Sequence, residues 1–205
     1  MLTANKLTLW RGSLCLFENL TFQVNDGSVL LVQGPNGSGK TTLLRVLCGL
    51  SRPESGSVQW NNESIESSRS IFGAQIAYFG HITGLKVDLT VNQNLAFAAR
   101  MLGQHNQRWE NYLEPLSLSH CANLPVRYLS AGQQRRTALA RVLMSDAKLW
   151  MMDEPFTNLD QAGREFIEGE LTRHLNGDGL AVVVAHHGLD LPQERLTTVH
   201  LGGLH

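Results

Sequence analysis

The sequence has few cysteines, no excess of one charge and no long hydrophobic run. Its three cysteines, Cys15, Cys48 and Cys121, are widely spaced and form no metal-ligand pattern, so we expect reduced thiols in a cytosolic protein. The formal net charge is -1 over 205 residues, so no global field draws the chain to nucleic acid or to anionic lipid. We therefore expect no nucleic-acid partner.

Membrane-directed segments are also missing from the sequence. Residues 1–6 do not begin a signal peptide with a basic and then an apolar region. The uncharged apolar stretches fall far short of the roughly 20 residues that span a bilayer. Any membrane role is therefore expected to go through another chain, and the length suits one domain with a sizeable core.

What the sequence does contain is a glycine-rich stretch between two apolar runs. It follows residues 29–32, precedes residues 43–47 and has the spacing G-x-x-x-x-G-K-T, which predicts a strand, a phosphate-binding loop and a helix. The glycines let successive N–H groups point inward as an anion nest at a helix N-terminus. The predicted nucleotide-binding residues are Gly34, Pro35, Asn36, Gly37, Ser38, Gly39, Lys40, Thr41 and Thr42.

Two side chains of this stretch have specific roles in phosphoryl transfer. Lys40 is expected to reach the β- and γ-phosphates, and the hydroxyl of Thr41 is expected to bind Mg²⁺. A glycine-rich turn beside a lysine would explain Gly37 and Gly39 alone, but it would not require every other motif position to be filled. The stretch therefore predicts a nucleoside triphosphate site.

Two carboxylates, Asp153 and Glu154, end the apolar run 149–152. Such a run is typical of a buried parallel strand, and open α/β sheets place their ligands at the carboxyl ends of strands. We expect Asp153 to hold Mg²⁺ and Glu154 to accept a proton from the attacking water. The alternative is a solvated acidic loop.

Two predicted helix starts each allow a structural and a functional interpretation. Ser130 and Gln133 fit the S-x-x-Q capping box, which satisfies free N–H groups. The functional interpretation is a second phosphate-facing helix N-terminus, where Gly132 allows close approach. Asp160 precedes a helix predicted over 161–175, and an N-cap alone would explain it.

Trp10 and His186 also have two interpretations each. Trp10 could stack on an adenine ring or form the buried end of a strand. His186 ends the apolar run 180–185 and could donate a hydrogen bond to a γ-phosphate, or belong to a satisfied surface pair with His187.

Alternating or apolar runs predict the strands, and helix-favouring segments lie between them. Thr90 is expected to cap one helix. Several helical or turn segments separate the strand 75–79 from the strand 149–154, which predicts a helical insert at about 82–145 in a single domain, 1–205. Strands are predicted at 7–10, 20–24, 29–32, 57–60, 75–79, 149–154, 180–185 and 197–201, and helices after residue 42 and at 91–101, 109–116, 130–145 and 161–175.

Together these elements resemble the nucleotide-binding domain of ABC ATPases over essentially the whole chain. Residues 129–133 resemble the L-S-G-G-Q signature, Asp153 and Glu154 the Walker B pair, residues 158–160 the D-loop, and His186 the switch histidine. The resemblance implies an α/β P-loop NTPase core with an N-terminal antiparallel β subdomain and an inserted α-helical subdomain. It also implies ATP and Mg²⁺ as ligands, and a head-to-tail dimer. In that dimer ATP lies between the Lys40 loop of one subunit and the signature of the other, which comprises Ser130, Ala131, Gly132 and Gln133.

A narrower resemblance is to the haem-exporter ATP-binding subunits of bacterial cytochrome c maturation, the CcmA type. It is carried by Gly80-His81, residues 84–86, Leu89-Thr90, the signature version with Ala131, and Asp-Glu-Pro-Phe-Thr at 153–157. It implies an ATPase that is peripheral at the cytoplasmic face of the inner membrane, bound to integral membrane subunits. Its ATP hydrolysis would drive haem export or release, with no haem bound by this chain.

Two positions depart from the wider family. His81 stands where a Q-loop glutamine is usual, so we expect it either to act on the metal side or to be a surface histidine. Ala131 replaces the first signature glycine and adds one methyl group. The rival functions are the ATPase of another small exporter of lipid or drug, a soluble non-transport ABC ATPase, and a P-loop kinase. A soluble ABC ATPase is disfavoured because that class usually has tandem domains or a coiled-coil insert. A kinase is disfavoured because it would need neither the signature nor His186.

Overall fold

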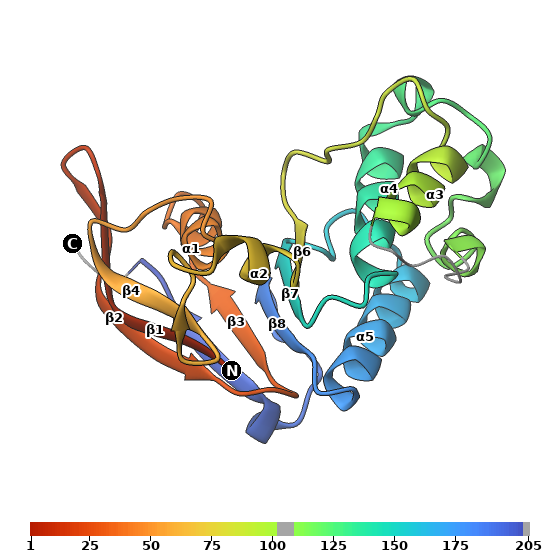
Figure 1. The fold of residues 1–205 in the computed structure, drawn as a ribbon. Helices are drawn as coiled ribbons and strands as arrows, with labels where there is room; N and C mark the ends of the chain where they lie inside the picture. Colours follow the sequence, from red (N-terminus) through yellow and green to blue (C-terminus); the bar gives the residue numbers. More distant parts are fainter. Residues whose placement is uncertain (102–108, 203–205) are drawn as a thin grey trace. The chain divides into compact units, whose positions relative to one another are not determined.

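The computed structural model describes residues 1–101 and 109–202. Figure 1 draws the helices and strands as a ribbon and labels most of them. In chain order these are β1 (Leu2–Arg11), β2 (Leu14–Val24), β3 (Val29–Gln33), α1 (Lys40–Leu47), β4 (Ser55–Trp60), β5 (Glu63–Ser64), α2 (Arg69–Gly73), β6 (Ile76–Phe79), α3 (Val91–Met101), α4 (Ala131–Leu143), β7 (Leu149–Asp153), α5 (Gln161–Asn176), β8 (Leu180–Val184) and β9 (Leu196–His200), with 3-10 turns η1 (Trp109–Tyr112), η2 (Ser119–Cys121), η3 (Val126–Tyr128) and η4 (Gln193–Arg195).

The described residues form two compact units. The first comprises Met1–Tyr78, Ala147–Pro155 and the described part of Thr172–His205, and the second comprises the described part of Phe79–Asp146 together with Phe156–Leu171. The helical insert predicted at about 82–145 in one domain 1–205 remains a prediction of domain organisation, and its residues 102–108 lie outside the described part, as do residues 203–205.

The first unit contains two sheets. One has the strand order β2-β1-β4-β5, and β1 pairs antiparallel with both β2 and β4. The other has the order β6-β7-β8-β3-β9, in which β3 runs parallel to β8 and β9, and β7 runs parallel to β8. The N-terminal antiparallel sheet and the P-loop sheet implied by the resemblance are therefore both present (Figure 1).

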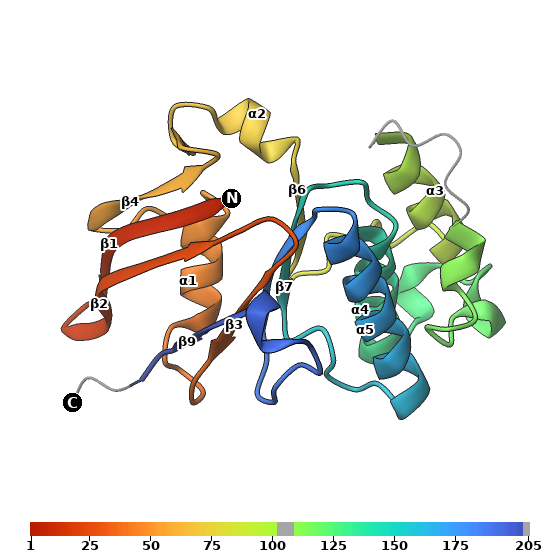
Figure 2. The same cartoon turned by 90° about the horizontal axis from the view of Figure 1, so that it is seen from below.

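An apolar cluster joins these two sheets and α1. It includes Leu2 of β1, Leu43 of α1 and Val182 of β8, each fully buried. Helix α1 contacts β7 and β8, and Figure 2 labels α1 and β7. All residues of β7 and β8 are buried, as expected of parallel strands covered on both faces. Burial also raises the pKa of the free thiol Cys48 to about 12, so this thiol stays protonated at neutral pH.

The strand order decides where the chemistry lies. Because β7, β8 and β3 are parallel neighbours, their carboxyl ends meet at one edge of the sheet. The glycine-rich loop follows β3, the two carboxylates end β7, and His186 follows β8. Three motifs that are far apart in the sequence are thereby brought to the same edge.

The second unit is built from α3, α4, part of α5 and short turns. Thr90 caps α3, because its Oγ1 accepts from the Gln93 amide at 3.1 Å and Gln93 Oε1 accepts from the Thr90 amide at 2.9 Å. The buried Asn94 also holds the preceding loop: its Oδ1 accepts from the Lys86 amide at 2.8 Å, and its Nδ2 donates to the carbonyls of Lys86, Leu89 and Thr90. No helix among the described residues is long and apolar enough to cross a bilayer.

Some predicted boundaries are wrong. The first two strands are longer than predicted. The helix predicted over 109–116 is only the 3-10 turn η1, which ends at Tyr112. Pro115 explains the difference, since proline has no amide donor and disfavours the helical conformation at the residue before it.

Candidate functional site

The glycine-rich loop ends at the first residue of α1. Gly39 is the N-cap of α1 and has a φ of 95°, in the left-handed region that favours glycine. Gly34 has a φ of 148°, and a Cβ there would overlap the Leu201 carbonyl. The left-handed φ of Gly39 and the close approach of Gly34 to the Leu201 carbonyl therefore both require glycine. The N–H groups at the start of α1 lie at the loop.

Lys40 is buried, with 6% of its surface exposed, and its ammonium group lies within the loop. Its Nζ donates to the carbonyls of Gly34 and Pro35, both at 2.8 Å. An ammonium group has three donors, so these carbonyls occupy two of them. The Ser38 hydroxyl is also buried and has no hydrogen-bond partner among the described residues. A buried cation, a buried hydroxyl and a helix N-terminus together fit a phosphate group.

The contact between Thr41 and Asp153 joins the first helix turn to the end of β7. Thr41 Oγ1 donates to Asp153 Oδ2 at 2.8 Å, across 112 residues of sequence. Asp153 is buried, with 1% of its surface exposed. A hydroxyl and a carboxylate at this position are the hard oxygen ligands that Mg²⁺ prefers. Thr41 and Asp153, two of the three residues that the sequence singled out for the metal, thus lie together beside the phosphate loop.

Glu154 and His186 form a pair at the same sheet edge. The distance from Glu154 Oε1 to His186 Nε2 is 3.3 Å. Glu154 has a φ of 53°, and its amide still donates to the Val184 carbonyl at 2.9 Å, which continues the pairing of β7 with β8. Both residues have roles predicted from the sequence, but their contact was not predicted. Its signal would have been the adjacency of β7 and β8, which no local pattern contains.

A cavity of about 540 Å³ borders the phosphate loop within the first unit. It is lined by residues from β2, by Pro35–Ser38 of the loop and by the end of β9. Trp10 lies near the end of β1, opposite Cys15 of this lining, and 42% of its surface is exposed. The interpretation of Trp10 as a buried strand end is therefore wrong, and an exposed ring remains for stacking.

The predicted signature begins α4 in the second unit. Ser130 is the N-cap: its Oγ accepts from the Gln133 amide at 3.2 Å, and Gln133 Oε1 accepts from the Ser130 amide at 2.8 Å. The capping box is thus confirmed. At Gly132 an added Cβ would meet only Ser130 Oγ, at 3.9 Å, which is ordinary contact. No contact of the described chain therefore requires glycine there, although glycine costs a helix up to about 1 kcal/mol relative to alanine.

Two further predicted site residues lie in the second unit. Asp160 Oδ1 accepts from the Gly163 amide at 2.9 Å, so it caps α5. His81 follows β6 and is exposed, and its role on the metal side stays a prediction. The segment after it is bound to α4, because Arg141 donates to the carbonyls of Thr83 and Gly84 at 3.1 and 3.2 Å.

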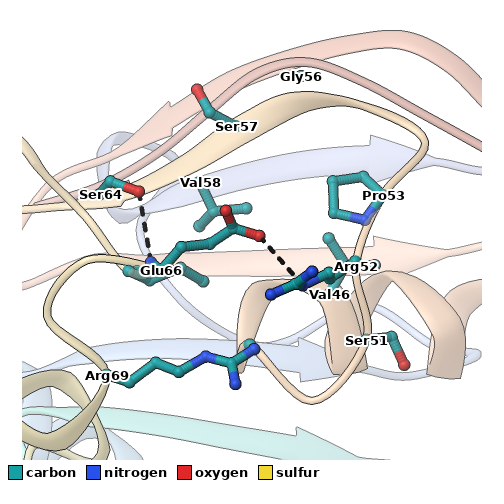
Figure 3. Close-up of a pocket in the computed structure, with 12 residues that line it drawn as sticks. Val46, Ser51, Arg52, Pro53, Gly56, Ser57, Val58, Ser64, Glu66 and Arg69 are labelled. Atoms are coloured by element: carbon teal, nitrogen blue, oxygen red, sulfur yellow. Dashed lines mark hydrogen bonds and ion pairs between the residues drawn. The ribbon is translucent and has the colours of Figure 1, made fainter.

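A smaller hollow of about 50 Å³ lies elsewhere in the first unit (Figure 3). It is lined in part by Arg52, Glu66 and Arg69, and Arg52 Nε lies 3.7 Å from Glu66 Oε1. None of the residues predicted to bind nucleotide lines it. The nucleotide site is therefore not the only concavity among the described residues.

The phosphate loop lies between β3 and α1, and Thr41 contacts Asp153 at the carboxyl edge of a parallel sheet. These two features define the class of P-loop nucleoside triphosphatases. Residues 17–157 match the ABC transporter family. The chain belongs to this family, which binds and hydrolyses ATP.

Individual relatives and a solved structure are similar to the chain. The "Cytochrome c biogenesis ATP-binding export protein CcmA" of Nitrosococcus oceani is 43% identical over 90% of this chain and 85% of its own length. The protein of the same name from Shewanella oneidensis is 39% identical over 98% of this chain and 94% of its own. The dimeric, post-hydrolysis structure of the ATP-binding cassette MJ0796, bound to ADP and Pi, has a TM-score of 0.78 at 24% identity and covers 98% of this chain and 94% of its own. This last similarity concerns the fold alone.

Proposed function

We propose that the chain is the ATP-hydrolysing subunit of a membrane export complex in cytochrome c biogenesis, whose ATP hydrolysis drives the export or release of haem. The contact of Thr41 with Asp153 beside the buried Lys40 carries the ATPase part of this proposal. The names of the relatives support the cytochrome c part. The haem part rests on the narrower sequence resemblance around His81 and Ala131.

In this function the loop amides and Lys40 bind the phosphates of ATP. Thr41 and Asp153 would hold Mg²⁺, which would neutralise charge on the phosphate oxygens. Trp10 stacks on the adenine beside the cavity that borders the loop. The buried Ser38 hydroxyl is available to a phosphate oxygen.

Glu154 accepts the proton of the attacking water. Its backbone conformation and its contact with His186 hold the carboxylate at the sheet edge where the phosphates lie. His186 orients Glu154 and senses the γ-phosphate, since a single imidazole N–H can donate to either acceptor. Positioning and charge stabilisation supply most of the catalysis in phosphoryl transfer.

A head-to-tail dimer completes the site. The signature contacts the ATP that is bound to the other subunit, through Ser130, Ala131, Gly132 and Gln133. Asp160 belongs to the D-loop. The glycine at 132, which no contact among the described residues requires, supports a close approach from outside. The dimeric neighbour with the same fold supports the arrangement.

The remaining partners are integral membrane subunits. The chain would be peripheral at the cytoplasmic face of the inner membrane, and it would not bind haem itself. His81 would act on the metal side. The segment after it, whose Thr83 and Gly84 carbonyls accept from Arg141, would transmit the nucleotide state to the membrane subunits.

The proposal is tested in cells whose only copy of the protein is Lys40→Ala. We expect holocytochrome c to be lost while other export continues, because the variant lacks the buried cation of the phosphate loop. The matched control is Lys6→Ala, which removes an exposed lysine of β1 and should leave holocytochrome c normal. Normal holocytochrome c in the Lys40→Ala cells would contradict the export role.

A further inference from the structure

His120 contacts the end of the helix that carries the signature. It is an exposed residue of η2, in the second unit, and its Nε2 lies 3.0 Å from Nε2 of Gln133. Gln133 is also the residue whose side chain closes the capping box with Ser130. The three residues therefore form one chain of contacts from η2 to the start of α4.

The chemistry of the side-chain groups determines which atoms of these three residues donate and which accept. Gln133 Oε1 accepts from the Ser130 amide, so the other end of the same amide group, Nε2, faces His120. An amide nitrogen only donates, so the imidazole Nε2 must accept. Only the neutral ring with its proton on Nδ1 accepts at that atom.

We propose that His120 is a positioning residue for the signature, acting through Gln133; this role rests on the proposed head-to-tail dimer. A capping glutamine loses much of its rotamer freedom, and a second contact for its amide offsets part of that loss. Without His120, Gln133 turns away more often, and the Ser130 amide then loses its acceptor. The Ser130 hydroxyl and the first N–H groups of α4 are consequently less well aligned for the phosphate of the other subunit.

The contact is too exposed to matter much for folding. A single solvent-exposed hydrogen bond contributes little to the free energy of unfolding. Its effect should instead appear in the association of two subunits, where each signature meets a nucleotide. Apart from His81, the residues proposed to bind ATP within one subunit lie in the first unit, and none of them contacts His120 in the described part of the chain, so binding by a dilute monomer should not depend on His120.

The test uses the full chain with Glu154→Gln, which slows hydrolysis, and measures two quantities. These are nucleotide affinity at a protein concentration where the chain is monomeric, and ATP-driven self-association by sedimentation. We expect His120→Leu to leave the affinity unchanged and to weaken self-association by about tenfold, the order expected from losing one hydrogen bond at each of two symmetric sites. His120→Gln supplies an acceptor and should restore most of the association.

Two controls separate positioning from folding. Ser119→Leu adds the same side chain at the neighbouring exposed position and should have no effect. In a Gln133→Ala background, His120→Leu should change nothing further, because its route to Ser130 is already removed.

The outcomes distinguish this role from the function on which it rests. If the Glu154→Gln parent does not self-associate with ATP, the head-to-tail dimer is wrong and this role falls with it. If the parent associates and His120→Leu associates equally well, only the role of His120 is wrong. An equal loss in Ser119→Leu, or full additivity with Gln133→Ala, would also overturn it.

Discussion

Glu154 combines an unusual backbone conformation with a position at the end of a buried strand. A non-glycine residue in the left-handed region costs about 1 kcal/mol or more, and such residues concentrate at functional sites. Here the left-handed φ of 53° directly follows β7, while the amide of Glu154 remains bonded to Val184 of β8. The surrounding sheet therefore holds the carboxylate where His186 contacts it.

Replacing Glu154 by glutamine keeps the side-chain shape and removes the proton acceptor. We expect Glu154→Gln to bind ATP with nearly normal affinity and to hydrolyse it at least ~10²-fold more slowly, the usual loss for a general base. The measurement is steady-state ATPase rate alongside nucleotide affinity. Lys40→Ala serves as a comparison, because it should weaken binding and turnover together. Near-normal turnover in Glu154→Gln would remove the role proposed for this carboxylate.

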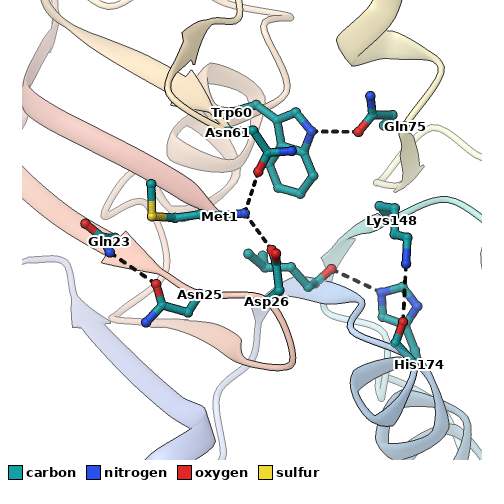
Figure 4. Close-up of polar contacts among 11 residues, drawn as sticks. Met1, Gln23, Asn25, Asp26, Trp60, Asn61, Gln75, Lys148 and His174 are labelled. Carbon is teal, nitrogen blue, oxygen red and sulfur yellow. Dashed lines mark hydrogen bonds and ion pairs between the residues drawn. The ribbon is translucent and has the colours of Figure 1, made fainter.

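The end of α5 packs against β7 and β8 through His174. The imidazole stacks on Trp150 with ring centroids 4.0 Å apart and an interplanar angle of 7°. It donates from Nε2 to the Leu180 carbonyl at 3.2 Å, and Figure 4 labels His174. A Cβ on Gly179 would overlap this ring, so the turn between α5 and β8 is packed tightly on it. Burial, with a smaller contribution from Lys148, lowers the pKa of His174 below its ordinary value.

This lowered pKa makes the free energy of unfolding depend on pH. The unfolded chain binds a proton at histidine below about pH 6.5, whereas folded His174 stays neutral to lower pH. Stability is therefore fully present above pH 6.5 and falls as the pH drops below it. We expect His174→Gln, which keeps an N–H donor but does not titrate, to lose less stability than the wild type between pH 7.5 and 5.5 in urea unfolding. The exposed His200→Gln is the control, and a profile for His174→Gln identical to that of the wild type would contradict this origin.

Self-association is a property of the whole molecule. A substitution at Gly132 is expected to change self-association and the free energy of unfolding in opposite directions. Within the chain a methyl group at this position meets only ordinary contact, so Gly132→Ala should raise the free energy of unfolding by up to about 1 kcal/mol. In the proposed dimer the same methyl group would meet the other subunit's nucleotide, and overpacking there costs about 1–3 kcal/mol. We therefore expect a more stable monomer whose ATP-driven association is weaker by about tenfold or more.

Gly169 provides a matched control for this pair of effects. It is an exposed glycine of α5, and an added Cβ would meet nothing within 4 Å. Gly169→Ala should stabilise the monomer similarly and leave association unchanged. Thermal unfolding and sedimentation with ATP measure the two quantities. Equal association in Gly132→Ala and Gly169→Ala would mean that no close contact forms at the signature.

Features that depend on a few neighbouring residues were determined by the sequence alone. The spacing of Gly34, Gly39 and Lys40 specifies the phosphate loop, because the nest and the helix N-terminus are made by consecutive residues. Thr90 and Ser130 each cap a helix through a partner three residues later, so their capping boxes were predictable as well. Buried parallel strands are equally visible as apolar runs.

Only the tertiary structure decided which of these local features meet. The order β7-β8-β3 places Thr41 against Asp153 and Glu154 against His186. The same arrangement buries a core drawn from residues far apart in the first unit. The contact of His120 with Gln133 depends in the same way on how η2 packs against α4. Local secondary-structure propensity contains no information about such pairs, because two residues far apart in the sequence interact only after the segment between them has folded and brought them together.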